Sequence, residues 1–151
     1  MRFVLTIMLA AAMLAVASAA AQAPSSCAAT PPDMLGPFYK ANAPERSKTG
    51  DGLTVKGAVR STRGCKALPG AKLEWWGANA SGEYDDAHRA TQVTDGQGSY
   101  TYVTDTPGRY PGRPVHLHVK ITAPGHKSLV TQVYPKPGQN SISFDFVLQP
   151  E

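Results

Sequence analysis

The sequence predicts an all-β protein, an antiparallel β-sandwich formed by a single domain. Apolar and polar residues alternate over several short stretches, and a period of two is typical of strands that bury one face. Clusters of Gly, Pro, Asn and Asp separate these stretches and predict turns. We find no helical period and no internal repeat. With 151 residues, the chain is long enough for one domain with a hydrophobic core.

The expected strands begin after residue 50. The first, residues 53–59, reads Leu-Thr-Val-Lys-Gly-Ala-Val and alternates apolar with polar side chains. The later expected strands are residues 71–76, 99–103, 115–121, 128–134 and 141–147. Turns are expected at residues 60–64, 68–70, 79–82 and 95–98. Tyr84 and His88 are expected to lie in a loop.

The N-terminus has the character of a targeting segment. Arg2 precedes an apolar, alanine-rich run that ends in small residues, the pattern of a secretory signal peptide. We expect cleavage after Ala23, with Ala19 and Ala21 as alternative sites. The mature protein is therefore expected to be exported, periplasmic or extracellular, and to have no membrane attachment. The expected division is residues 1–23 as signal peptide, 24–50 as an irregular segment and 51–151 as the β-sandwich domain.

Two cysteines and a modest positive charge bear on the compartment and the partners. Cys27 and Cys65 are the only cysteines, and in an exported chain an even pair favours one disulfide over two free thiols. The formal net charge is +4, from 15 Lys and Arg against 11 Asp and Glu. Because the basic residues are scattered and form no basic helix or aromatic-interleaved patch, a nucleic-acid partner is not expected.

The most informative motif is a His-x-His pair. His116 and His118 alternate with Val115, Leu117 and Val119, so both imidazoles leave the same face of an expected strand. Two imidazoles on one face can bind a single metal ion, each through one ring nitrogen. The alternative is a solvated strand edge or a pair of satisfied structural side chains.

Tyr110 and Arg113 precede the two histidines and extend the motif. A phenolate ligand together with a fixed positive charge indicates ferric iron and an anionic, oxygen-rich substrate. A Cu(II) or Zn(II) site on the same histidines is an alternative, but it would leave the tyrosines unexplained.

Sequence blocks in a fixed order identify a possible family. They are Gly-Pro-Phe-Tyr at residues 36–39, Leu-Pro-Gly-Ala-Lys-Leu-Glu-Trp at 68–75, Asn-Ala-Ser-Gly-Glu-Tyr at 79–84, Pro-Gly-Arg-Tyr at 107–110 and Arg-Pro-Val-His-Leu-His at 113–118. In order and spacing they resemble the catalytic core of the intradiol ring-cleavage dioxygenases, the family of protocatechuate 3,4-dioxygenase and catechol 1,2-dioxygenase. The resemblance implies four iron ligands, namely Tyr84, Tyr110, His116 and His118. It also implies that Arg113 is the active-site arginine and that Gln132 is a pocket glutamine.

The resemblance also implies a prealbumin-like β-sandwich and a non-haem Fe(III)-dependent dioxygenase. Its substrates would be O2 and a catechol-type small molecule, which opens between its two hydroxyl-bearing carbons to a muconate-type diacid. Two phenolates and two imidazoles form a hard, anionic ligand set that favours Fe(III) over Fe(II). The family implies that the catechol displaces Tyr84, which helps to take up a substrate proton, and that Arg113 stabilises negative charge on the ring. It further implies a homo-oligomer.

Two intervals are shorter than in well-known members of the family. Tyr110 lies 26 residues after Tyr84 and six residues before His116, so part of the loop that normally walls the substrate pocket is missing. Such an open pocket could accept larger catechols, or could bind iron without turnover. The alternative function is a non-catalytic secreted prealbumin-like binding module, which would share the turns but would not need His116, His118 and Arg113 together with Tyr84.

Overall fold

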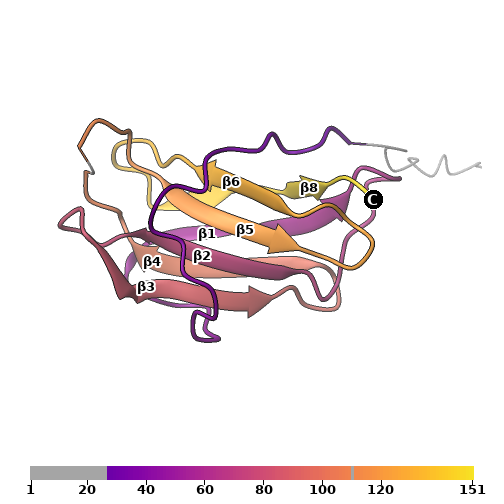
Figure 1. Ribbon diagram of the computed structural model, residues 1–151, viewed down its shortest axis with the longest axis horizontal. Helices are drawn as coiled ribbons and strands as arrows, with labels where there is room; N and C mark the ends of the chain where they lie inside the picture. Colours follow the sequence, from indigo (N-terminus) through magenta and orange to yellow (C-terminus); the bar gives the residue numbers. More distant parts are fainter. Residues whose placement is uncertain (1–26, 110) are drawn as a thin grey trace, which may run out of the picture.

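The structure, a computed structural model, describes residues 27–109 and 111–151. Within these ranges all regular structure is β, which confirms the predicted all-β class (Figure 1). In the same ranges we find no helix long and apolar enough to cross a membrane. The predicted signal peptide and Tyr110 lie outside the described residues. The strands are β1 (Gly52–Ser61), β2 (Lys72–Ala78), β3 (Tyr84–Val93), β4 (Ser99–Asp105), β5 (Leu117–Thr122), β6 (Leu129–Val133), β7 (Ser141–Ser143) and β8 (Phe146–Leu148).

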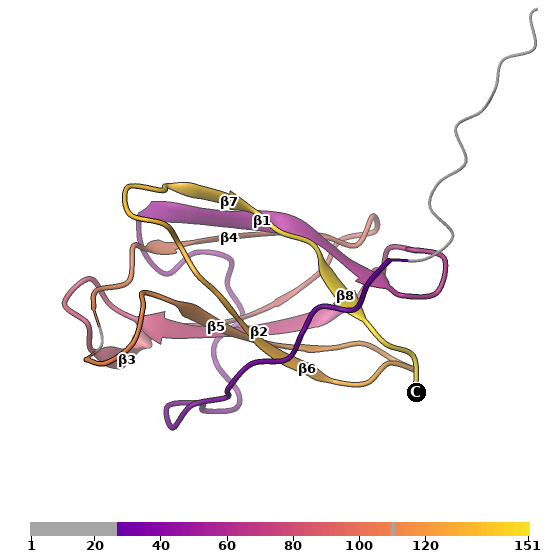
Figure 2. The same ribbon diagram turned by 90° about the horizontal axis from the view of Figure 1, so that it is seen from above.

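Two four-stranded sheets form the layers of a sandwich (Figure 2). The first sheet has the order β4-β1-β7, with β8 also paired to β1, and the second has the order β3-β2-β5-β6. β4 is antiparallel to β1, and all neighbours in the second sheet are antiparallel. β7 and β8 both run parallel to β1. The predicted β-sandwich is therefore confirmed, with one mixed sheet and one antiparallel sheet.

The core lies between the two sheets, and the alternation of side chains leaves a second, polar face outside. Trp75 of β2 is buried between the layers and stacks on Tyr102 of β4, with ring centroids 4.7 Å apart. The next residue, Trp76, points to the other face of the sheet. There Trp76 is the cross-strand neighbour of His118, and His118 is the neighbour of Gln132. This outer face of the second sheet is where the predicted site residues gather.

Residues 27–50 form a segment that we call the N-terminal strap, and its middle part covers the outer face (Figure 2). The Asp33 amide donates a hydrogen bond to the Val130 carbonyl of β6 at 2.9 Å. The Tyr39 hydroxyl donates to Glu74 Oε1 of β2 at 3.1 Å. The strap therefore crosses the second sheet from β6 to β2, and it encloses the side chains between them.

A disulfide attaches the N-terminal end of the strap to the sandwich. It joins Cys27 to Cys65, in the turn after β1, with Cα atoms 5.3 Å apart. This confirms the disulfide expected from the sequence. The strap then contacts β8, where two hydrogen bonds of 3.0 and 2.8 Å link Thr30 to Val147.

The strand β3 corrects one sequence expectation. Tyr84 is the first residue of β3 and His88 lies within it, so the expectation that both lie in a loop is wrong. The first half of the strand is polar, so no apolar alternation marks it. Hydrogen bonds make its buried polar residues tolerable: the Arg89 guanidinium, for example, donates to the Phe38 carbonyl of the strap at 2.6 Å.

The C-terminal strand expected at residues 141–147 is in fact two strands, β7 and β8. Between them, the Asp145 carboxylate accepts a hydrogen bond from the Ala58 amide of β1 at 2.9 Å and pairs with Arg60 at 2.7 Å. A side chain thus replaces backbone pairing where the chain passes from one strand to the next. The alternation of apolar and polar residues in the sequence does not reveal this interruption.

Candidate metal centre

Three predicted ligands converge beneath the strap. The Tyr84 hydroxyl lies 3.1 Å from His116 Nε2 and 3.2 Å from His118 Nε2, and the two Nε2 atoms are 3.1 Å apart. Tyr84 begins β3, His118 is on β5, and His116 immediately precedes β5. Both histidines project from the outer face because they are two residues apart on extended chain. The fourth predicted ligand, Tyr110, lies outside the described residues.

Backbone carbonyls determine which nitrogen of each histidine carries its proton. His116 Nδ1 lies 2.7 Å from the Pro114 carbonyl, and His118 Nδ1 lies 3.2 Å from the Met34 carbonyl. A carbonyl oxygen only accepts, so each Nδ1 carries a hydrogen, and in the neutral form of the ring Nε2 then presents a lone pair. This is the usual arrangement of metal-binding histidines, whose other nitrogen donates to a fixed acceptor.

Burial keeps the second histidine neutral. His118 is only 3% exposed, and its ring stacks on Trp76 with centroids 4.9 Å apart. Burial, with a smaller contribution from the neighbouring His116, lowers the pKa of His118 to about 4. At neutral pH His118 is therefore the uncharged imidazole that a metal ion requires.

The donor atoms fit a metal ion better than they fit one another. When each Nδ1 carries the ring proton, the two Nε2 lone pairs face each other over 3.1 Å, and no hydrogen bond can link two acceptors. A cation between them would relieve this repulsion. Two N or O ligands about 2.1 Å from one ion and at right angles are about 3.0 Å apart, which matches the three observed separations. Among the described residues, no cluster of three or more His, Cys, Asp or Glu side chains offers another site.

A small cavity of about 180 Å³ opens beside these donors. Arg113 and Gln132 line it, and the guanidinium donates to Gln132 Oε1 at 2.8 Å. Gln132 in turn donates to the Met34 carbonyl at 2.8 Å. Gln132 therefore holds Arg113 at the rim, where its positive charge faces the space next to the ligands. The structure thus brings together all predicted site residues that it describes.

The strap contributes residues that the sequence did not single out as parts of the site. The Phe38 ring stacks on Tyr84 with centroids 4.2 Å apart, and Gly36 and Met34 also line the cavity. Phe38 and Gly36 belong to the Gly-Pro-Phe-Tyr block at residues 36–39, so the resemblance contained the signal. The spacing of residues along the chain did not indicate these contacts, because the strap reaches the histidines only in the folded protein.

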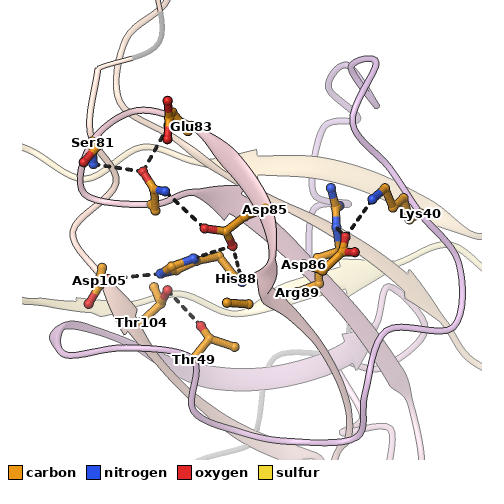
Figure 3. Close-up of polar contacts among 12 residues, drawn as sticks. Lys40, Thr49, Ser81, Glu83, Asp85, Asp86, His88, Arg89, Thr104 and Asp105 are labelled. Atoms are coloured by element: carbon orange, nitrogen blue, oxygen red, sulfur yellow. Dashed lines mark hydrogen bonds and ion pairs between the residues drawn. The ribbon is translucent and has the colours of Figure 1, made fainter.

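A second polar cluster holds the start of β3 in place (Figure 3). His88 lies between two carboxylates, with Nδ1 2.7 Å from Asp85 and Nε2 2.9 Å from Asp105 of β4. Asp85 also accepts a hydrogen bond from the Asn79 amide at 3.1 Å. Burial lowers the pKa of His88, but the hydrogen bonds to Asp85 and Asp105 outweigh it and leave that pKa above its usual value. The cluster fixes the residue that directly follows Tyr84.

Comparison with known proteins agrees with this geometry. A family model described as "Dioxygenase" matches residues 36–149. The 6-chlorohydroxyquinol 1,2-dioxygenase of Cupriavidus pinatubonensis is 31% identical, over 82% of this chain and 56% of that protein. The dioxygenase domain of a dioxygenase carbohydrate-binding protein fusion from Streptomyces sp. SirexAA-E has a TM-score of 0.75 at 35% identity, over 82% of this chain and 100% of that one. The intradiol ring-cleavage dioxygenase from Tetranychus urticae has a TM-score of 0.67 at 29% identity, over 72% and 65% of the two chains.

Fold and donors together define a β-sandwich protein with a candidate metal centre on the outer face of one sheet. The chain belongs to the intradiol ring-cleavage dioxygenase family, as the extent of these matches shows, and the resemblance seen in the sequence is confirmed. The matches do not favour the alternative of a non-catalytic binding module. The chain spans about half the length of the curated relatives it matches, 56% and 46% for two of them.

Proposed function

We propose that the protein is a non-haem Fe(III)-dependent intradiol dioxygenase that adds O2 to a catechol-type substrate and releases a muconate-type diacid. The observation that carries the proposal is the convergence of Tyr84 Oη, His116 Nε2 and His118 Nε2 at 3.1–3.2 Å. Relatives named as hydroxyquinol and catechol 1,2-dioxygenases support the catechol class of substrate. By family resemblance, Tyr110 is the fourth proposed ligand.

The bound ferric ion would supply the charge that holds both catechol oxygens and the redox chemistry that joins the ring to O2. The remaining work belongs to side chains. A catechol that binds as a dianion must lose two protons, and the Tyr84 oxygen lies where it can take one of them. Arg113 presents a fixed positive charge to the ring, and this charge is already oriented by Gln132 before the substrate enters.

The first test is the visible absorption spectrum of the Fe(III)-loaded protein without oxygen, before and after addition of catechol. We expect a tyrosinate-to-iron charge-transfer band that shifts with catechol, followed by ring opening when oxygen is admitted. A colourless protein that binds no iron would overturn the proposal.

Variants identify which groups hold the ion. Tyr84→Phe and His118→Gln should each lower iron affinity by more than about 100-fold, since even loss of an outer hydrogen bond to a ligand costs 10–100-fold. His126→Gln is the matched control, because His126 bonds Ser61 at 2.9 Å and does not line the cavity. Equal iron affinity in all three variants would place the metal elsewhere.

The proposal extends to the location of the protein: we infer export after cleavage of the signal peptide. The disulfide between Cys27 and Cys65 supports this, because such bonds persist in oxidising compartments. N-terminal sequencing of the protein recovered from periplasm or medium should begin near residue 24. Recovery of the uncleaved chain from the cytoplasm alone would contradict it.

A further inference from the structure

A second and larger cavity lies next to the candidate metal centre. It encloses about 670 Å³ and is formed by the loop between β4 and β5 and the loop between β6 and β7. Figure 1 shows both loops, one orange and one yellow, at the same end of the sandwich. Arg113 lines this cavity as well as the smaller one beside the ligands. The two cavities are therefore neighbours, and Arg113 borders both.

The second cavity is basic. Arg109, Arg113 and Lys136 line it, and no Asp or Glu does. None of the three cations forms an ion pair with a carboxylate of the described residues. Asp33 lines neither cavity. Its carboxylate accepts a hydrogen bond from Tyr134, which lowers the pKa of Asp33, and Arg113 lowers this pKa to a smaller extent. Among the described residues, Arg109 and Lys136 thus have no carboxylate partner, and Arg113 has only the longer-range attraction of Asp33.

Most of the remaining wall is apolar, with Thr106, Gly112 and Gly138 completing it. Pro114, Val115, Pro135 and Pro137 line the cavity between the cations. Proline holds its own backbone near one φ value, so these two loops have little freedom to collapse into the space. Apolar walls with a few charged groups are typical of a site that binds a small organic anion.

We propose that this basic cavity is a subsite for an anionic chain carried on the catechol ring. The inferred substrates are catechols joined to an aliphatic chain that ends in a carboxylate. The chain would lie along the prolines and Val115, and the carboxylate would pair with Arg109 and Lys136. The inference rests on the proposed function, because that function puts the catechol ring at the histidines.

The test compares pairs of substrates that differ only in charge. The ratio of kcat/KM for 3-(3,4-dihydroxyphenyl)propanoate to that for its methyl ester is measured in the wild type, in Arg109→Met/Lys136→Met and in a control. The control, Lys56→Met/Arg63→Met, removes the same charge from exposed positions that do not line the cavity. We expect a ratio above one that falls about fivefold in the cavity variant and stays constant in the control, a size typical of partly exposed charge pairs. Equal ratios in all three proteins would overturn the subsite.

A binding measurement separates this inference from the proposed function. 3-Phenylpropanoate has the anionic chain but no hydroxyl groups for iron, and its binding is followed by NMR through the backbone amides of Gly112 and Gly138, which line the cavity. Saturable shifts that disappear in Arg109→Met/Lys136→Met would support the subsite even if no catechol is ever opened. Ring opening of catechol without any such shift would support the dioxygenase and overturn the subsite.

Discussion

At the scale of single residues, Gly36 of the strap lies against the imidazole of His118. Gly36 has φ of 70°, in the left-handed region that glycine tolerates best. A Cβ atom at this position would lie 3.1 Å from His118 Cε1. A side chain at residue 36 would therefore press on the imidazole, which would have to move by a few tenths of an ångström.

Gly36→Ala should affect both stability and metal binding. The left-handed conformation should cost about 1–2 kcal/mol for alanine, and the new methyl group should displace His118 and lower iron affinity about tenfold. Chemical unfolding and iron titration measure the two effects.

The matched control is Gly70→Ala, because Gly70 has φ of 75° and its Cβ would meet nothing within 4 Å. We expect a similar loss of stability with unchanged iron affinity. If both variants bind iron like the wild type, the close approach of the strap does not position His118.

At the scale of secondary-structure elements, the polar cluster around His88 joins the start of β3 to the end of β4. The histidine is 9% exposed and touches a carboxylate through each ring nitrogen. Because its pKa is raised above the ordinary value of 6.5, the folded state binds this proton more tightly than the unfolded state does. The stabilisation is complete below pH 6.5 and is lost as the pH rises through the raised pKa.

His88→Gln should be less stable than the wild type by about 1–3 kcal/mol at pH 6, since a buried polar network loses a partner. The difference in free energy of unfolding should shrink as the pH rises from 6.5 through the raised pKa of His88, because the wild type then loses its His88 proton. Asp85 and Asp105 have lowered pKa values and stay ionised over this range. Denaturant unfolding of both proteins at several pH values measures this difference in stability. A difference that does not depend on pH would contradict a charged His88 between the two carboxylates.

A second element-scale feature is the passage from β7 to β8 along β1. Gly57 lies at this point, and a Cβ there would overlap the Phe144 carbonyl. Gly57→Ala should therefore cost about 3 kcal/mol, as overpacking against rigid backbone does.

Gly96→Ala is the control for Gly57→Ala, because Gly96 lies in a turn where a Cβ meets nothing within 4 Å. It should change the free energy of unfolding by less than about 0.5 kcal/mol. Urea unfolding of both variants measures the contrast, and equal stabilities would show that β1 can shift to accept a methyl group.

At the scale of the whole molecule, one disulfide and a series of hydrogen bonds hold the strap over the site. The double variant Cys27→Ala/Cys65→Ala opens a loop of 38 residues, which should lower the free energy of unfolding by about 3–4 kcal/mol. Iron affinity should stay within about threefold, because the part of the strap near the ligands is held independently by Asp33 and Met34. A large loss of iron affinity would mean that the covalent link itself orders the site.

Much of the architecture could be predicted from the sequence where local pattern and tertiary environment agree. Strands such as β1 and β4 have one more deeply buried face, so their alternation is visible in the residues. The His-x-His pair falls on one face for the same reason. β3 could not be predicted, since its buried polar residues are compensated by partners such as the Phe38 carbonyl that are distant in sequence. The predicted roles of Tyr84, Tyr110, Arg113 and Gln132 remain predictions until the variants are measured.

The sequence by itself determined the all-β class, the disulfide partners, the family and the face of β5 on which the histidines lie. Each of these depends on residue types and short spacings, which are local properties of the chain. Only the tertiary structure decided that the strap covers the ligands, that the Met34 carbonyl orients His118, and that Arg109 and Lys136 border one basic cavity. These contacts join segments separated by 27 to 84 residues, and such distances in sequence are closed only when the two sheets pack and the strap is drawn across them.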